Sequence, residues 1–385
     1  MKKIVLAACV ARVAFADITW GADANGNERA VGSNLNALNN GGLASADLQS
    51  VINSLTGQSS TVVNPALDQL HPAAMSAFAE LQTELGGQLL NLFHRTPQLT
   101  CGCSKEARIW IEPFGNWLDE RPQGEQLGFQ ATTAGIAFGG DYQFYSVWTI
   151  GFGGAWNTTD LTWKLDRGHS YINGLYGSFY TDLLLGSFYF GSALYAGGDW
   201  YKTARHMQFT SVDRTAHSNS GGFDFGAQVA SAYYFGIPIC LFYPYATVDY
   251  LLLNNCAFSE SGANSLDLEI SSYRSSTLRS EAGIGVQVID KNYNETVCIT
   301  PSFAIGWVME LPLHRSSYTA TFAGQTIPFT VEGWKETWQL FNLRFGLGLT
   351  LWCFNLDSQY QFEVSGDKDR AYFAQRANFR VSYNF

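Results

Sequence analysis

The sequence predicts an all-β transmembrane fold, a 12-stranded antiparallel outer-membrane β-barrel with an N-terminal α-helical segment in or below the pore. Three observations predict it. Twelve segments of the 385-residue chain alternate apolar and polar residues, the chain is poor in charge, and short connections alternate with long ones. Because successive side chains of a strand point to opposite faces, this alternation suits a wall between lipid and a polar lumen.

The last segment shows the alternation most clearly. Between Tyr372 and Phe385, one face carries Phe379, Tyr383 and Phe385, and the opposite face carries Arg376 and Arg380. The pattern runs to the final residue and keeps its charges on the inner type of face, as the closing strand of an outer-membrane barrel would.

The composition excludes several classes of protein. Charged residues make up 15% of the chain, whereas about 25% is usual in a globular domain. No uninterrupted apolar run of roughly 18 residues occurs, which excludes a spanning helix. Aromatic residues make up another 15%, and 38 residues are Gly, as aromatic girdles and half-apolar strands require. The net charge of −10 argues against nucleic acid as a partner, because phosphate binding needs clustered Lys and Arg.

The predicted strands cover residues 108–118, 128–145, 147–164, 168–185, 187–203, 219–235, 239–254, 275–290, 296–311, 336–352, 354–365 and 372–385. The first is the least regular, since Trp110 and Phe114 lie on the opposite face from Ile109 and Ile111. Five charged residues on the polar faces are predicted to face the lumen: Arg344, Asp357, Glu363, Arg376 and Arg380.

The connections support the same count. Every second join is tight, and the joins between are longer and polar, at residues 119–126, 160–167, 202–218, 257–275, 312–335 and 365–370. Outer-membrane barrels place short turns in the periplasm and long loops outside the cell. An even number of strands then returns both ends of the barrel to the periplasmic side. A soluble all-β fold is the alternative, but it gives no reason for so regular an alternation.

The segment before the barrel has helical periodicity. Residues 72–94 are predicted to form a pore helix, because Phe78, Leu81, Leu85 and Leu89 recur at helical spacing, and a second short helix is predicted at 44–55. The helices could form a periplasmic appendage, or the longer one could thread the lumen. A helix of 22 residues would be about 33 Å long, enough to cross the pore.

Several stretches, in order along the chain, resemble the C-terminal translocator domain of bacterial autotransporters (type V secretion). They are NGNERAVGSNLNAL (Asn25–Leu38), NPALDQLHPAAMSAF (Asn64–Phe78), RIWIEPFGNW (Arg108–Trp117), TAGIAFGGDYQF (Thr133–Phe144), YPYATVDYLLLNNCAFSESGA (Tyr243–Ala263), STLRSEAGIGVQV (Ser276–Val288) and ITPSFAIGWVMEL (Ile299–Leu311). The resemblance implies a twelve-stranded barrel with a helix in its pore that anchors or exports an N-terminal passenger polypeptide. It also implies that Phe385, with Tyr383, belongs to a signal read by the barrel-assembly machinery, and that periplasmic chaperones and outer-membrane lipid are further partners.

The N-terminus predicts an imperfect signal peptide at residues 1–16. Lys2 and Lys3 precede an apolar run, and Ala14-Phe15-Ala16 is a small-x-small cleavage site, but Arg12 interrupts the run. A lipoprotein-like sequence ending at Cys9 is the weakest alternative. Residues 17–104 then form a short linker region and 105–385 the barrel. Residues 17–24 alone remain for a passenger, so the chain is expected to be a fragment or a passenger-less member.

Chemistry has little support in the sequence. Cys101 and Cys103 precede the first strand on the side expected to be oxidising, so a disulfide is possible, as is an intermolecular disulfide or no role. No G-x-S-x-G or H-E-x-x-H motif occurs, and no catalytic, metal or cofactor site is predicted. Self-cleavage would need Asn91 with Asp357 or Glu363, but polar residues are expected on these surfaces in any case. A porin-like channel, or an adhesin acting through the loop at 312–335, is the alternative to a translocator.

Overall fold

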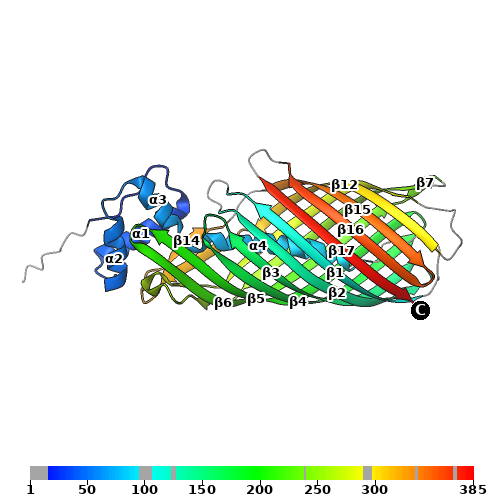
Figure 1. The fold of residues 1–385 in the computed structure, drawn as a ribbon, viewed down its shortest axis with the longest axis horizontal. Coiled ribbons are helices and arrows are strands. Elements are labelled where there is room, and N and C mark those ends of the chain that lie inside the picture. The colour runs from blue at the N-terminus through cyan, green and yellow to red at the C-terminus, as the bar shows by residue number, and fades with distance from the viewer. Residues whose placement is uncertain are drawn as a thin grey trace, which may run out of the picture.

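A closed barrel of twelve long antiparallel strands forms the main body of the molecule (Figure 1). The computed structural model describes residues 16–94, 106–122, 127–237, 240–288, 297–333, 337–366 and 371–385. The barrel strands are β1 (Ala107–Glu120), β2 (Phe129–Phe144), β3 (Trp148–Trp163), β4 (Gly168–Leu185), β5 (Phe188–Phe209), β6 (Val212–Tyr233), β8 (Cys240–Asn255), β11 (Tyr273–Val288), β12 (Val297–His314), β15 (Trp338–Leu351), β16 (Phe354–Ser365) and β17 (Tyr372–Asn384). A short strand, β7 (Phe235–Ile237), pairs with the start of β8.

The last strand closes the barrel against the first. β17 pairs with β1 from Arg108↔Asn384 to Glu120↔Tyr372. The backbone of Phe385 continues this ladder, since its N–H donates to the carbonyl of Ala107 at 2.9 Å. Closure leaves no free edge in the barrel wall, which is the condition for a sheet to span a bilayer. The predicted fold of twelve strands is therefore confirmed.

The two faces of the wall differ as the alternation predicted. Phe152, Ile305 and Leu347 are exposed on the outer face, whereas Trp110 and Phe114 of β1 are 4% and 5% exposed. These two aromatic residues point inward because they pack in one buried cluster with the helix inside the barrel. The irregular phase of the first strand thus reflects an apolar patch on the lumen wall.

One predicted loop is wrong. The polar stretch at 202–218 belongs to β5 and β6, which continue to a two-residue turn at Thr210, where φ is 45°. Met207, Phe209 and Val212 of this extension are buried. The sequence predicted a loop here because the stretch is rich in polar residues, and only one face of the strand extension packs against the protein.

The connections β8–β11 and β12–β15 fold into a second sheet beyond the barrel rim. Its four strands run in the order β14 (Phe329–Glu332), β13 (Ser317–Phe322), β10 (Leu268–Ile270) and β9 (Phe258–Ser259). A 3-10 turn, η2 (Asn264–Leu266), precedes β10. These connections are therefore structured rather than open polar loops.

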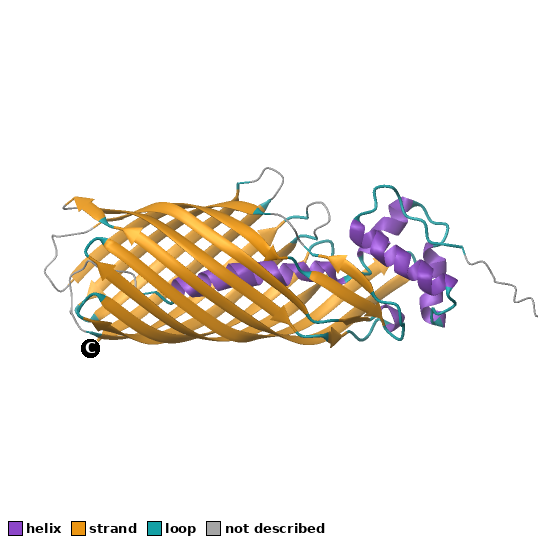
Figure 2. Cartoon of the chain, turned by 180° about the vertical axis from the view of Figure 1, so that it is seen from behind, coloured by secondary structure: helices purple, strands orange, loops and turns teal. Residues whose placement is uncertain are grey.

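The helical segment lies partly inside the barrel and partly at its mouth (Figure 2). It comprises α1 (Gly26–Asn40), α2 (Ala46–Leu55), α3 (Ser60–Asp68), η1 (Pro72–Met75) and α4 (Ser76–Leu92). The helices predicted at 44–55 and 72–94 are confirmed, while the periodicity did not predict α1 and α3. Between the two placements left open by the sequence, the structure puts α4 in the lumen and α1–α3 at the end opposite Phe385. Among the described residues, no helix is long and apolar enough to cross a membrane.

Candidate functional site: the lumen and its helix

α4 is buried along most of its length by the inner wall of the barrel. Its apolar side chains, among them Leu85 and Leu89, cluster with Trp110, Tyr180 and Tyr195 from β1, β4 and β5. At Gly86 a Cβ atom would overlap the Tyr195 hydroxyl and lie 2.7 Å from Leu251 Cδ2. The glycine that weakens the helix in isolation therefore lets it approach the wall closely.

An ionic cluster joins the middle of α4 to the part of the wall formed by β11, β12, β16 and β17. Glu84 pairs with Arg279 of β11 at 3.3 Å and with Arg376 of β17. Both arginines also pair with Glu363 of β16, and Arg279 pairs with Glu310 of β12. Every one of these side chains is at least nine-tenths buried. Removing one partner from such a cluster strands a buried charge at a cost of about 3–5 kcal/mol, so the cluster strongly favours one position of the helix.

The C-terminal end of α4 is held by Arg380. Its guanidinium donates to the carbonyls of Leu92 and His94, the latter at 2.9 Å, and lies over the Trp110 ring at 4.6 Å. The last carbonyls of a helix lack partners within the helix and carry partial negative charge, so a cation is favoured here. His94 continues the network to Asp182 at 2.7 Å and Gln228 at 2.6 Å.

The wall on the β4–β6 side is built from tyrosine–aspartate pairs. Tyr176 donates to Asp199 at 2.6 Å, and Tyr195 donates to Asp224 at 3.1 Å. Each bond satisfies one carboxylate oxygen of the aspartate that accepts it. The tyrosine–aspartate pairs give this part of the lumen a polar lining, in contrast to the apolar outer face of the barrel.

The five residues predicted to face the lumen occupy two regions. Glu363 and Arg376 lie in the ionic cluster, and Arg380 caps α4. Arg344 pairs with Glu281 and lies over the Tyr245 ring at 5.2 Å. Together with Asp357 and Arg380, it lines a cavity beyond the end of α4.

Three charged residues that complete the cluster were not singled out from the sequence: Glu84, Arg279 and Glu310. Arg279 and Glu310 do lie on the polar faces of their predicted strands, and that is the one signal for them. Only the closed barrel shows that they meet the helix.

The cavity beyond α4 has a volume of about 280 Å³ and a largely polar lining. Asn91, Asp357 and Arg380 contribute to it. Asn91 accepts a bond from Gln228 at 3.4 Å, while Glu363 is engaged with two arginines. In the part of the chain that the structure describes, no group of three or more His, Cys, Asp or Glu residues is placed to hold a metal ion. Cys101 and Cys103 lie outside the described residues, so their disulfide stays a prediction.

The chain ends in a cluster of aromatic rings on the outer face. Tyr383 and Phe385 stack with ring centroids 6.2 Å apart, and Phe354 lies 4.7 Å from Tyr383. Phe385 remains 55% exposed, so its ring is accessible at the barrel rim.

A closed antiparallel barrel with an apolar outer face and a polar lumen defines an outer-membrane β-barrel protein. The family model for the autotransporter beta-domain matches residues 109–357, more than half of the chain. The chain belongs to this family, and it carries an outer-membrane translocator domain.

Solved structures agree with this assignment at the level of the fold. The translocator domain of the autotransporter NalP from Neisseria meningitidis is similar with a TM-score of 0.60 and 15% identity, covering 82% of this chain and 100% of that one. The beta domain of the Bordetella autotransporter BrkA has a TM-score of 0.54 and 14% identity, covering 73% and 100%. The search among curated proteins found no match.

Proposed function

We propose that this chain exports the polypeptide N-terminal to α4 across the outer membrane and then anchors it there. In this proposal the end with Phe385 and the short turns faces the periplasm, and the long connections with α1–α3 face the outside of the cell. The barrel is a conduit and performs no chemistry, so neither a catalytic residue nor a cofactor is assigned.

The path of the chain is the observation that supports this proposal. α4 begins at Ser76 near the mouth that carries α1–α3 and ends at Leu92, whose carbonyl contacts Arg380 deeper in the lumen. The polypeptide before Ser76 therefore lies at the mouth opposite Phe385. α4 runs from there through the lumen toward the end at which β1 begins. A chain threaded in this way is what remains when an N-terminal segment has been transported.

The remaining assignments belong to the same proposal. Residues 1–16 would direct the chain to the periplasm, 17–104 would be exported or threaded, and 105–385 would form the barrel. Phe385 and Tyr383 would be recognised by the barrel-assembly machinery after periplasmic chaperones deliver the chain. The apolar side chains on the outer face of the barrel would contact outer-membrane lipid.

A reporter fusion tests export. A small folded domain placed ahead of Asn25 is expected to reach the cell surface, measured by protease accessibility on intact cells. The matched control deletes Phe385 and should lower the amount of assembled barrel together with surface display. A fused domain that stays periplasmic while the barrel assembles normally would refute export.

A porin-like channel is the second candidate, favoured by the polar cavity at the Phe385 end. α4 and its ionic cluster argue against a porin, because a helix held lengthwise inside the lumen obstructs free diffusion. Single-channel conductance distinguishes a translocator from a porin-like channel, because only an open lumen conducts freely.

A further inference from the structure

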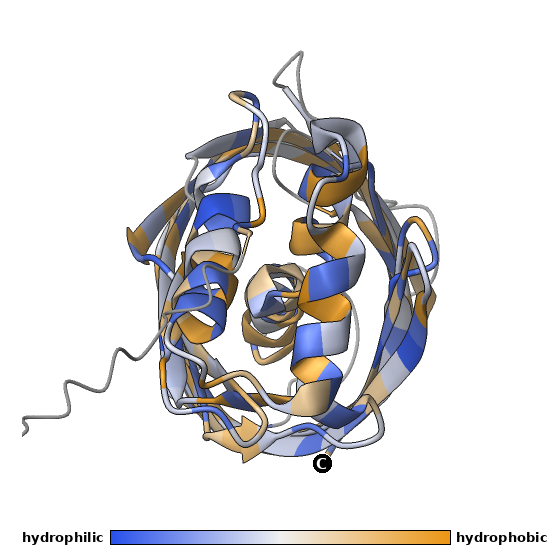
Figure 3. Ribbon diagram, turned by 90° about the vertical axis from the view of Figure 1, so that its left-hand side faces the viewer, coloured by the Kyte–Doolittle hydropathy of each residue, from blue (hydrophilic) through white to orange (hydrophobic). Residues whose placement is uncertain are grey.

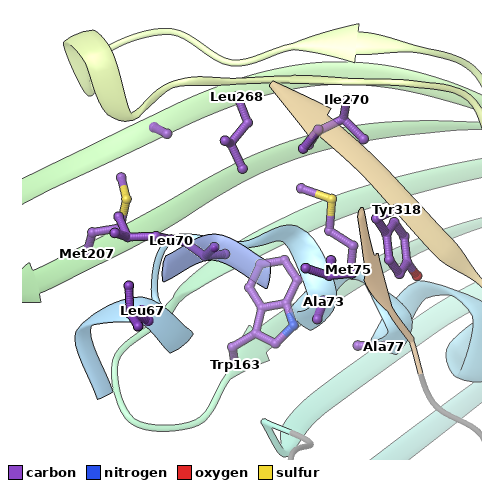
Figure 4. Close-up of a cluster of buried hydrophobic side chains, with 14 of the residues drawn as sticks. Leu67, Leu70, Ala73, Met75, Ala77, Trp163, Met207, Leu268, Ile270 and Tyr318 are labelled. Atoms are coloured by element: carbon purple, nitrogen blue, oxygen red, sulfur yellow. The ribbon is translucent and has the colours of Figure 1, made fainter. Parts of the chain in front are cut away.

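The mouth of the barrel opposite Phe385 contains an apolar core of the kind found in soluble domains. Figure 4 shows side chains from α3, η1, the start of α4, β3, β5, β10 and β13 meeting in one place. Leu67, Leu70, Met75 and Tyr318 within it are at most 2% exposed. This core is a separate cluster from the one that packs α4 against the barrel wall deeper in the lumen, so it forms its own packing unit at the mouth.

The helices α1–α3 contribute one side of that core. Their fully buried apolar residues are Val31, Leu35, Leu38, Leu48, Ile52, Leu55, Val63, Ala66 and Leu67. Seen along the barrel from this end, the helices lie in front of the mouth, with α4 end-on at the centre (Figure 3). The apolar side chains of the helices thus pack over part of the mouth and are as buried there as in a protein interior.

α1 also covers a free strand edge of the small sheet. The Asn27 amide donates to the Glu332 carbonyl at 2.9 Å and accepts from the Glu332 N–H at 2.8 Å. Asn34 donates to the Ile327 carbonyl at 2.9 Å. An uncovered edge invites pairing with other chains, so these bonds show that the small sheet and α1 are built for each other.

A charge pair at the rim fixes α2. Arg214, in the extension of β6, binds both carboxylate oxygens of Asp47 at 2.7 and 2.8 Å. Asp47 also accepts from the Ser265 backbone and hydroxyl, and Arg214 donates to the Ala263 carbonyl at 3.1 Å. Bidentate pairing of this kind is specific in orientation. It ties α2 to β6 and to the turn η2 at once.

The end of α3 is tied to the same extension by Arg205. Its guanidinium donates to the Gln69 carbonyl at 2.8 Å and to the Leu266 carbonyl at 3.0 Å, and it forms a bidentate pair with Glu260. Arg205 is 7% exposed, so this connection is internal, whereas the Asp47 side chain is 40% exposed and reachable by water. The Asp47–Arg214 pair is therefore the more exposed of these two contacts.

We propose that α1–α3 are a resident lid over part of the mouth opposite Phe385, including the buried first turn of α4 at Ala77, and that the Asp47–Arg214 pair is its latch. The lid contacts the extensions and connections of the barrel strands rather than the main ladder. It can therefore open while the barrel stays closed and α4 stays in place. This proposal goes beyond transport, because it concerns the folded protein and holds whether or not a passenger is exported.

The test measures access to a side chain beneath the lid. Ala77, on the first turn of α4, is 2% exposed. It is replaced by Cys in the full chain, the purified protein is treated with a membrane-impermeant maleimide, and labelling of the peptide containing residue 77 is followed by mass spectrometry. Leu43→Cys, at a position that is 52% exposed, is the matched control and should react equally fast in every background.

Charge reversal supplies the discriminating variants. Asp47→Arg or Arg214→Asp alone should raise the labelling rate of the Cys at 77 roughly tenfold, because each places like charges at the latch. The double variant D47R/R214D should return the rate to within roughly threefold of the parent protein. Asp47→Asn removes the charge without repulsion and should give an intermediate rate, which provides a second measurement if a reversal variant fails to assemble.

Two results would overturn the proposal. Equal labelling rates at residue 77 in the parent, the single variants and Asp47→Asn would show that the mouth is not gated by this pair. A rate increase in the double variant equal to the product of the two single increases would show that the two residues do not act on each other. Neither result bears on export, which is decided by the fusion experiment in cells.

Discussion

Gly86 and Gly87 are neighbours on α4 but have different surroundings. A Cβ at Gly86 would lie 2.7 Å from Leu251 Cδ2 and overlap Tyr195, whereas the nearest atom to a Cβ at Gly87 is Arg279 Nε at 3.5 Å. The first glycine is needed for close approach to the barrel wall. The second carries only the usual helix penalty of glycine.

The two positions therefore predict opposite effects of the same substitution. Gly86→Ala should lower the free energy of unfolding by about 1–3 kcal/mol, because an extra methyl overpacks a tight contact. Gly87→Ala should raise it by up to about 1 kcal/mol, because alanine favours the helix and meets only ordinary contacts. Denaturant midpoints of the refolded protein, followed by the gel mobility of the closed barrel, would measure both.

The comparison carries its own control, since the two variants change the helix propensity of α4 by the same amount. Equal midpoints for both would mean that α4 is not packed against β5 and β8 as described.

At the scale of the element, the junction between α3 and η1 contains a buried histidine. His71 is 4% exposed, and its Nδ1 accepts a bond from the Ala73 N–H at 3.3 Å. Burial, with Arg205 and Arg167 nearby, lowers the pKa of His71 to about 3. The third facing group is Asp68 of α3, 3.6 Å from His71 Nε2; burial raises its pKa, and Arg167 opposes that rise.

This junction predicts that the lid loosens in acid. The folded state keeps His71 neutral, whereas the unfolded chain binds a proton below a pKa of about 6.5. The free energy holding α1–α3 should fall as the pH drops from about 6.5, by up to about 1.4 kcal/mol per pH unit. Asp68 has the opposite sign, because its raised pKa favours the folded state as its own proton binds, so it offsets the loss only at the acidic end.

A dye attached to Leu43→Cys would measure this dependence. Urea titrations followed by the anisotropy of the dye should show a lower midpoint for lid release at pH 5 than at pH 7.5. The variant His71→Gln should lose that difference, since it removes the titrating group. A midpoint that is the same at both pH values in the parent protein would contradict the assignment of a neutral buried His71.

At the scale of the whole molecule, the lumen holds two obstructions in series, the lid and α4. The ionic cluster around Glu84 fixes α4 lengthwise inside the pore. The lid contacts only the strand extensions and connections at the end opposite Phe385. Removing residues 65–95 should raise single-channel conductance in planar bilayers well above that of the intact protein. The deletion takes α4 out of the lumen and joins the remainder of α1–α3 to the start of β1 at the Phe385 end, where they no longer reach the opposite mouth.

Removal of residues 17–64 is the matched deletion, because it takes away most of the lid and leaves α4 in the lumen. Its conductance should remain close to that of the intact protein. High conductance in the intact protein would favour the porin-like alternative over the translocator.

The sequence by itself determined the strands and their faces, because alternation with a period of two is a local property that each segment carries alone. All twelve barrel strands lie where alternating segments predicted them, and Phe379 and Arg380 fall on the expected opposite faces. The helix at 72–94 could be predicted for the same reason, since its period is also local.

The tertiary structure alone decided which inward residues meet. Glu84 and Arg376 are 292 residues apart in sequence, and no periodicity connects them. Contacts with distant parts of the chain also decided three other features. They are the inward orientation of Trp110, the strand extension at 202–218, and the lid with its latch. In each case the residue pattern is set by a partner from a distant part of the chain, and only closure of the barrel brings that partner into contact.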